Sequence, residues 1–315
     1  MNIVFFGTPA SAVPTLDALA ASGHTLSMIV TQPDRPSGRS GAPRPPAVKT
    51  AALGAGLLVM QPERVKTPEF RQAIADRRPD LLVVVAYGRI LPEPLLEAAP
   101  MGAVNVHFSL LPRYRGAAPV QWALVNGDEV TGVTTMRMNA RMDEGDVLLR
   151  AEVPVAPLEH APALTSRLAV VGASLLLETI ARLAEGTIEA RPQDPALATY
   201  APLLAATDGA ADPSLPATAI EGRVRGFDPW PGVWFRRRGR RIRIVEARAV
   251  EGASTAEPSG AVLGLDGDAI RIVCGAGTLL SVASVQPEGG RVIGAREAVN
   301  GRHLVAGDRL ERIVS

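Results

Sequence analysis

An amide and an imidazole lie two residues apart at the end of a β-branched run, in the stretch "GAVNVHFSLLPRYRG". Alternate residues of a strand share one face, so Asn105 and His107 are expected to project the same way. Two such donors side by side stabilise an oxygen that gains negative charge, as acyl transfer requires. Neither residue is a good nucleophile here, and no Ser or Cys lies in an elbow motif. The pair therefore predicts a transfer reaction whose nucleophile belongs to a substrate.

A third group is needed to orient or charge the imidazole, and a short acidic turn offers three candidates. The turn "RMDEGDVLL" contains Asp143, Glu144 and Asp146. Asp146 is placed to cap the strand that follows, which favours Asp143. The alternative for His107 is a histidine that serves only the structure, and the residues alone leave that alternative open.

The elements that must position these groups alternate between strands and helices through the first half of the chain. Apolar runs such as "NIVFF", "TLSMIVT", "DLLVVVAY" and "GAVNVHF" predict strands buried on both faces, with helical patterns between them. This alternation predicts an α/β fold with a Rossmann-like, mostly parallel sheet. A long amphipathic helix is expected from about residue 161 to 185. His107 would then lie at the carboxyl end of a strand, where open parallel sheets bind ligands.

The second half of the chain has a different pattern. The stretch "GTIEARPQDPALATYAPLLAATDGAADPSLPAT" contains five prolines and weak periodicity, as linkers do. Short alternating strands joined by Gly and Asp turns follow it, which predicts a small β-barrel of the OB-like kind. We therefore expect a first domain over residues 1–189, a linker over 190–207 and a barrel domain over 208–315.

Composition restricts the class of protein. The chain has 315 residues, of which 47% are hydrophobic and 21% charged, and this fits a soluble globular protein of two domains. Its single Cys274 forms neither an internal disulfide nor a zinc site alone, so we expect no metal site and a reducing, cytoplasmic location. We expect that no apolar run is long enough to cross a membrane, and the apolar N-terminus lacks the basic region of a signal peptide.

Charge is concentrated in two places although the net charge is only +1. Residues 223–248 contain nine arginines and two acids, a local charge of +7. A long Pro, Gly and Arg loop, residues 32–46, carries Arg35, Arg39 and Arg44. Both features suggest a polyanionic partner; the alternatives are a solvated hairpin turn and a loop without a role. The chain has no G-x-G-x-x-G and no P-loop, which argues against NAD or ATP.

The motifs, taken in order, resemble the folate-dependent formyltransferases. "NVHFSLLPRYRGAAPVQWAL" is similar to the signature of that family, and "FFGTPASA", "TQPDRPSGR", "VVVAYGRILP", "RMDEGDVL", "TYAPLL" and "GFDPWPGVWF" extend the similarity across the chain. The resemblance implies a catalytic centre of Asn105, His107 and Asp143. It also implies a pocket for 10-formyltetrahydrofolate, the formyl donor and co-substrate, with no tightly bound cofactor. The pocket residues that it implies are Ser109, Leu110, Leu111, Pro112, Tyr87, Gly88 and Ile90. Phe108 stands where the family usually has a small residue, beside this pocket.

Within that family the resemblance is strongest to the members that formylate methionyl initiator tRNA. It implies that the loop around Arg39 meets the acceptor end of the tRNA and that the barrel domain binds the body of the tRNA. The arginines expected to contact tRNA are Arg35, Arg39, Arg44, Arg236, Arg237, Arg238, Arg240 and Arg241. Two other functions are compatible with parts of this pattern: formylation of a nucleotide-linked amino sugar, and RNA binding on a vestigial enzyme scaffold. We expect a monomer without membrane association.

Overall fold

The protein divides into two compact units. The computed structural model describes residues 1–36 and 41–313. The N-terminal unit comprises Met1–Pro119, Val130–Pro154 and Thr165–Ala201. The C-terminal unit comprises Val120–Glu129, Val155–Leu164 and the chain from Pro202 onward. Residues 190–201, the first part of the expected linker, are thus packed within the N-terminal unit.

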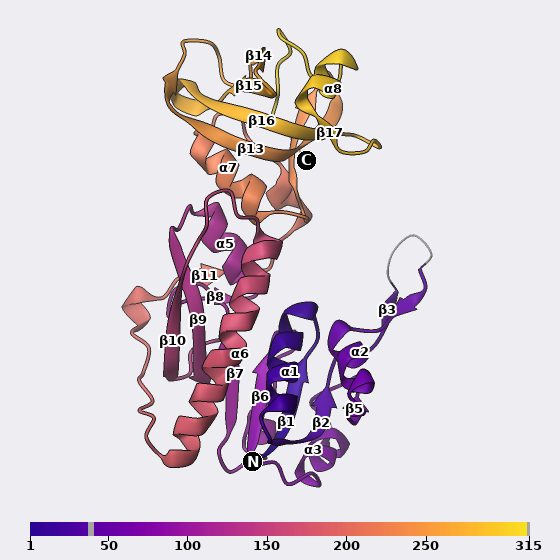
Figure 1. The fold of residues 1–315 in the computed structure, drawn as a ribbon, viewed down its shortest axis with the longest axis vertical. Coiled ribbons are helices and arrows are strands. Elements are labelled where there is room, and N and C mark those ends of the chain that lie inside the picture. Colours follow the sequence, from indigo (N-terminus) through magenta and orange to yellow (C-terminus); the bar gives the residue numbers. More distant parts are fainter. Residues whose placement is uncertain (37–40, 314–315) are drawn as a thin grey trace. The chain divides into compact units, whose positions relative to one another are not determined.

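A seven-stranded sheet forms the centre of the N-terminal unit (Figure 1). In spatial order its strands are β10 (Val147–Pro154), β9 (Val130–Arg137), β7 (Ala103–His107), β6 (Leu81–Val85), β1 (Asn2–Gly7), β2 (Thr25–Val30) and β5 (Val59–Met60). The five strands from β7 to β5 are mutually parallel, whereas β9 and β10 are antiparallel to their neighbours. Every residue of β6 and β7 is buried, as the continuous apolar runs predict. The Rossmann-like, mostly parallel sheet is confirmed.

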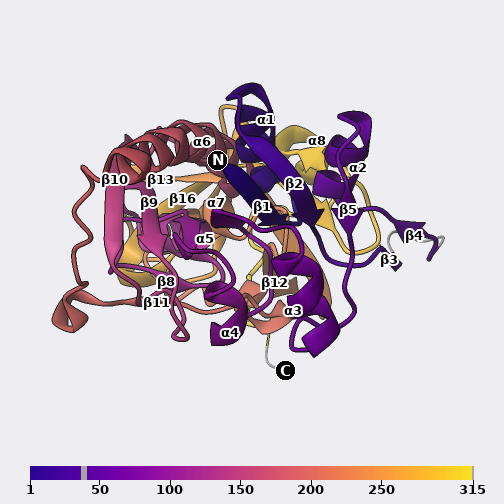
Figure 2. The ribbon, with the colours of Figure 1, turned by 90° about the horizontal axis from the view of Figure 1, so that it is seen from below.

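Helices cover both faces of this sheet (Figure 2). On one face lie α1 (Val13–Ala21), which contacts α2 (Ala47–Gly54), and α6 (Ala161–Glu185). On the other lie α3 (Pro68–Ala75) and α4 (Glu93–Leu96). Alternate strand residues divide between the two faces: Phe6 packs in the cluster that includes Phe70 of α3, and Phe5 lies beside Ala12. The unit also contains two short 3-10 turns, η1 (Ala10–Ala12) and η2 (Pro195–Leu197). Two small two-stranded ribbons complete it: β3 (Arg35–Pro36) pairs with β4 (Pro43–Arg44), and β8 (Arg115–Gly116) pairs with β11 (Tyr200–Ala201).

The long helix α6 has the expected bounds but corrects one expectation. By length and composition alone it is long and apolar enough to cross a membrane, so the statement that no run reaches such a length was wrong on this measure. Half of its most apolar window is buried inside the protein. Leu168, Leu176 and Ile180 are fully buried and lie on one side of the helix, as in a core helix packed on a sheet.

The C-terminal unit is an antiparallel sheet closed on itself. Its strands follow the order β12 (Val233–Arg237), β13 (Arg240–Ser254), β16 (Thr278–Pro287), β15 (Ala269–Val273) and β14 (Val262–Asp266), with β17 (Ile293–Gly294) paired to β16. The chain after residue 307 joins the two edges: Glu311 exchanges backbone hydrogen bonds with Arg236 of β12, and Leu310 donates to Gly260, just before β14. Closure removes the free edges, and the predicted small β-barrel is confirmed.

Helices also accompany the barrel, which the strand pattern did not predict. These are α5 (Pro119–Val125), α7 (Ala217–Gly226) and α8 (Ala295–Asn300), with 3-10 turns η3 (Ala206–Gly209) and η4 (Gly275–Gly277). In α7 the buried residues Ala217, Ile220 and Val224 recur at helical spacing and pack in the barrel core. Gly222 and Gly226 lie against the backbone of α5, where a Cβ would approach carbonyl oxygens to 2.8 and 2.6 Å. These glycines allow the two helices to pack closely.

Candidate active site

Strand β7 presents Asn105 and His107 on one face and Val104 and Val106 on the other. Asn105 and His107 are 9% and 6% exposed and lie opposite Met136 and Thr134 of β9. Phe108 points the other way, toward α6, where a Cβ on Gly172 would lie 3.4 Å from its ring. The large residue at 108 is therefore accommodated by a glycine of α6, on the face away from the candidate site.

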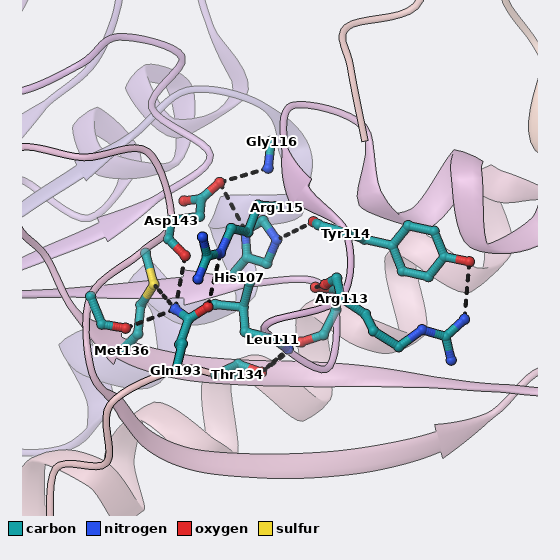
Figure 3. Close-up of polar contacts among 12 residues, drawn as sticks. His107, Leu111, Arg113, Tyr114, Arg115, Gly116, Thr134, Met136, Asp143 and Gln193 are labelled. Carbon is teal, nitrogen blue, oxygen red and sulfur yellow. Dashed lines mark hydrogen bonds and ion pairs between the residues drawn. The ribbon is translucent and has the colours of Figure 1, made fainter. Parts of the chain in front are cut away.

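The imidazole of His107 is fixed by a backbone carbonyl (Figure 3). Its Nε2 lies 2.8 Å from the carbonyl oxygen of Tyr114, and a carbonyl only accepts hydrogen bonds, so Nε2 is assigned the proton. Tyr114 has a φ of 60°, in the left-handed region. This turn aims the carbonyl at the ring and leaves Nδ1 as the nitrogen that faces Asp143.

Asp143 lies beside His107 but does not bond it directly. Its Oδ2 is 3.8 Å from Nδ1 of His107, and the same oxygen accepts a hydrogen bond of 2.8 Å from the backbone nitrogen of Gly116. Asp143 lies in the connection between β9 and β10, and its carboxylate faces the imidazole (Figure 3). The carboxylate is thus held by the loop that follows His107 as well as by its own loop.

The other two acids of the turn have different surroundings. Glu144 pairs with Arg115 at 3.2 Å and with Arg141 at 3.5 Å. The backbone carbonyl of Asp146 accepts a hydrogen bond from the backbone nitrogen of Arg137. Of the three candidates, Asp143 is the one that lies against His107, and its role as the third catalytic group stays a prediction.

The site offers hydrogen-bond donors to an oxygen. The side-chain amide of Asn105 makes no hydrogen bond to any residue within the described ranges, although the residue is nearly buried. No group of three or more possible metal-ligating side chains occurs among the described residues. A buried amide beside an oriented imidazole is suited to stabilise an oxyanion.

Comparison with known proteins gives the chain a family. Residues 1–180 match the family model described as formyl transferase, and residues 204–303 match that of the formyl transferase C-terminal domain. The chain is 46% identical to the methionyl-tRNA formyltransferase of Koribacter versatilis over 316 residues, which cover the whole of both chains. It is 47% identical to that of Solibacter usitatus over 98% of both chains. The chain belongs to the methionyl-tRNA formyltransferase family.

Solved structures with the same fold are more distant in sequence. The sugar 3N-formyl transferase WlaRD has a TM-score of 0.65 at 13% identity, over 90% of this chain and 97% of its own. HypX from Aquifex aeolicus, solved in complex with tetrahydrofolic acid, has a TM-score of 0.62 at 16% identity, over 94% of this chain and 46% of its own. At these identities the similarity supports the fold alone, including the attached C-terminal unit.

In this member of the methionyl-tRNA formyltransferase family, the segment after His107 is held by hydrogen bonds within the segment and to Thr134 of β9. The hydroxyl of Ser109 donates to the carbonyl of Arg113, and the carbonyl of Ser109 accepts from the hydroxyl of Thr134. That hydroxyl also accepts from the backbone nitrogen of Leu111. Ser109 and Leu111 are fully buried, Pro112 is buried and Leu110 half-buried. These side chains shape the loop, so a ligand here would meet mainly its backbone and Leu110.

The second expected pocket segment follows β6. The ring of Tyr87 is buried in the core and packs edge-on against Phe6, with 5.4 Å between ring centroids. Gly88 has a φ of 79°, and a Cβ there would lie 2.6 Å from the amide nitrogen of Gln32. Ile90 is 60% exposed. Because β6 and β7 are parallel neighbours, this turn and the loop after His107 leave the same edge of the sheet. Of the three expected residues, Ile90 is the one with an apolar surface available to a ligand.

The arginines of the first-half loop are placed only in part. Arg35 and Arg44 face each other across the β3–β4 ribbon, and both are exposed. Arg39 lies outside the described residues. At the base of the ribbon, Asp34 accepts hydrogen bonds from Lys49 and Gln61, which lower the pKa of its carboxyl group. The ribbon is therefore anchored at its base, next to the exposed Arg35–Arg44 pair.

The arginines of the second cluster have two different environments. Arg237 and Arg238 pair with the fully buried carboxylate of Asp308, at 2.7 and 2.8 Å. Arg236 lies in β12 and exchanges backbone hydrogen bonds with Glu311. Arg240 and Arg241 are exposed on β13. With Arg237, Arg291, Glu297 and His303 they line a cavity of about 370 Å³.

Proposed function

We propose that this protein transfers the formyl group of 10-formyltetrahydrofolate to the α-amino group of methionyl initiator tRNA. Two observations support the proposal together. Relatives named methionyl-tRNA formyltransferase match the chain over its whole length, and His107 is held between the Tyr114 carbonyl and Asp143 with Asn105 on the same face. The amide and imidazole supply the donors that an attacked formyl oxygen requires.

The reaction begins when the amine nitrogen attacks the formyl carbon. The carbonyl π electrons move to oxygen, and the resulting oxyanion accepts hydrogen bonds from the Asn105 amide and from Nδ1 of a protonated His107. When the intermediate collapses, the carbon–N10 bond of the folate breaks and N10 receives a proton. The amine loses one proton, so the products are a formamide and tetrahydrofolate.

Asp143 has a double role in this proposal. Its carboxylate, 3.8 Å from Nδ1, offsets the positive charge that the imidazole carries when both of its nitrogens hold a proton. Directly or through a water molecule it also accepts the proton that the attacking amine loses. The separation from Nδ1 is longer than a hydrogen bond, so both groups are available to a substrate atom or a water molecule that approaches them from one side.

The two parts of the chain have different functions in this proposal. We assign catalysis and donor binding to residues 1–189, with the donor lying along the backbone of residues 109–112, Leu110, Gly88 and Ile90. Residues 190–207 join them to the barrel domain, 208–315, which binds the tRNA body. The arginines of residues 35–44 meet the acceptor end. We expect the enzyme to act as a monomer in the cytoplasm, where its tRNA substrate is charged.

The deciding experiment supplies the purified full-length protein with 10-formyltetrahydrofolate and three acceptors in parallel. These are methionyl initiator tRNA, methionyl elongator tRNA and a UDP-linked amino sugar. Selective formylation of the initiator supports the proposal. Transfer to the sugar alone would replace it with the amino-sugar function, and tRNA binding without transfer or folate binding would favour an RNA-binding role.

A further inference from the structure

A buried glutamine from the segment after α6 reaches the loop that carries Asp143 (Figure 3). Gln193 is 9% exposed, and its Nε2 donates to the carbonyl oxygens of Asp143 at 2.8 Å and Gly145 at 2.7 Å. Both hydrogens of the amide are used by these two bonds. Gln193 therefore fixes the backbone on either side of Glu144.

The same amide also contacts the loop that follows His107. The Oε1 of Gln193 accepts a hydrogen bond of 3.0 Å from Nε of Arg115. The guanidinium of Arg115 also forms an ion pair of 3.2 Å with Glu144. The Arg115 side chain is 5% exposed, and Gln193 and Glu144 both face its charge. Gln193, Arg115 and Glu144 thus connect the two loops. An amide is required at 193, because glutamate would bring no donor to the two carbonyls and leucine would offer neither donor nor acceptor.

A second residue of this segment holds the peptide that orients the imidazole. Thr199 Oγ1 accepts from the backbone nitrogen of Tyr114 at 2.8 Å, and its carbonyl accepts from the nitrogen of Arg115 at 2.8 Å. The backbone nitrogen of Thr199 donates a hydrogen bond to the carbonyl oxygen of Pro112 at 3.2 Å. The carbonyl of Tyr114 is the acceptor for Nε2 of His107. Thr199 therefore fixes the position of the carbonyl that orients His107.

The geometry of the catalytic pair is set from outside the pair. At 3.8 Å, Nδ1 of His107 and Oδ2 of Asp143 are beyond hydrogen-bond distance, so no direct bond between them fixes their separation. We propose that Gln193 and Thr199 are positioning residues that set this separation, Gln193 through the Asp143 loop and Thr199 through Tyr114. Neither touches the reacting atoms. This inference rests on the proposed function, because it concerns the same site.

The test uses Gln193→Leu and Thr199→Val in the full-length protein. Misplacement of a catalytic group by about 1 Å costs on the order of 100-fold in rate, so we expect kcat to fall by roughly 10- to 100-fold while KM for both substrates changes little. Thr199→Ser keeps the hydroxyl and should restore kcat. Matched controls are Gln72→Leu and Thr187→Val, which change exposed residues of α3 and of the chain after α6. Both controls should have wild-type kcat.

A double substitution separates positioning from a general structural role. If Gln193 acts through Asp143, adding Gln193→Leu to Asp143→Asn should leave the residual kcat almost unchanged. An equal loss in both backgrounds, or wild-type kcat in both Gln193→Leu and Thr199→Val, would overturn the inference. The wild-type rate tests the proposed function separately. A crystal structure of Gln193→Leu tests the positioning even if methionyl-tRNA is not the substrate: Asp143 displaced from His107 supports it, and an unchanged pair contradicts it.

Discussion

Nδ1 of His107 lies 3.8 Å from Oδ2 of Asp143, while Nε2 of the same ring lies 2.8 Å from the carbonyl of Tyr114. The two nitrogens therefore have separate tasks. Nε2 anchors the ring to the backbone, and Nδ1 faces the carboxylate. A direct imidazole–carboxylate bond would occupy Nδ1, so the separation is consistent with a pair whose members both act on a substrate that approaches from one side.

Removal of either member of this pair should affect chemistry more than binding. We expect His107→Ala and Asp143→Asn each to reduce kcat by about 100- to 1,000-fold, because each removes charge stabilisation that matters mainly in the transition state. Folate affinity, measured by calorimetry, should remain within a few-fold of wild type. The exposed residue Asp17 provides a control, and Asp17→Asn should be fully active. Wild-type turnover in either site variant would exclude that residue from catalysis.

The Asp143 loop tolerates no side chain at Gly145. A Cβ there would lie 1.7 Å from the carbonyl oxygen of Arg137, so Gly145→Ala must displace the loop or the end of β9. We expect a loss of kcat of at least tenfold together with a lower Tm, because the same shift strains the backbone and moves Asp143.

Gly54 provides the comparison for that substitution. It is the last residue of α2, and a Cβ there would meet no atom within 4 Å. Gly54→Ala should keep wild-type kcat and should not lower Tm, since alanine favours the helix. Wild-type kinetics in Gly145→Ala would mean that the loop relaxes without moving the carboxylate.

Much of the fold could be predicted from the sequence because its signals are local. Continuous apolar runs identified the buried parallel strands, and the amphipathic pattern of residues 161–185 matched α6. The segment that closes the barrel could not be predicted in this way. Closure depends on backbone bonds from Leu310 and Glu311, whose flanking sequence has no strand pattern. The helical spacing in α7 was present but is short and interrupted by glycines.

The site was predictable only where side chains reveal it. The two-residue spacing placed Asn105 and His107 on one face, and the acidic turn narrowed the third group to three residues. The Tyr114 carbonyl could not be found, because a backbone acceptor leaves no mark in the sequence. Gln193 is 78 residues from Arg115 in a Pro- and Ala-rich stretch that is typical of a linker. Its role depends on tertiary packing.

The exposed arginines of the barrel should account for part of the salt dependence of tRNA binding. Arg240 and Arg241 are exposed, and no ion pair joins either to another residue in the described ranges. Replacing both by alanine should flatten the plot of log affinity against log salt by about one unit for each phosphate that the variant no longer neutralises. Filter binding at several salt concentrations measures this slope. An unchanged slope would remove these residues from the tRNA surface.

Arg237 should behave differently from its neighbours, because it pairs with the buried Asp308. Arg237→Ala leaves that carboxylate with Arg238 as its remaining charged partner, and Arg238 is 68% exposed. We expect a loss of about 1–3 kcal/mol in the stability of the C-terminal unit, measured by denaturant unfolding. Arg241→Ala is the matched control and should leave stability unchanged. A stability loss in Arg241→Ala and none in Arg237→Ala would contradict this division.

A buried thiol and a buried phenol hydroxyl should make the stability of the protein fall at alkaline pH. Burial raises the pKa of the Cys274 thiol to about 12 and that of the Tyr87 hydroxyl to about 12. In the unfolded chain these groups ionise near pH 9 and pH 10. Between those values and pH 12 the unfolded state has lost protons that the folded state still holds. Stability should therefore be unaffected by these groups below pH 9 and fall as pH rises toward 12.

Single substitutions separate the two contributions, because Cys274 lies in the C-terminal unit and Tyr87 in the N-terminal unit. Cys274→Ala should remove the part of the decline that begins near pH 9, and Tyr87→Phe the part that begins near pH 10. The Tyr87 hydroxyl has no hydrogen-bond partner among the described residues, so Tyr87→Phe should cost little at neutral pH. Denaturant unfolding from pH 7 to 11 measures both effects. A decline unchanged in both variants would show that other groups cause it.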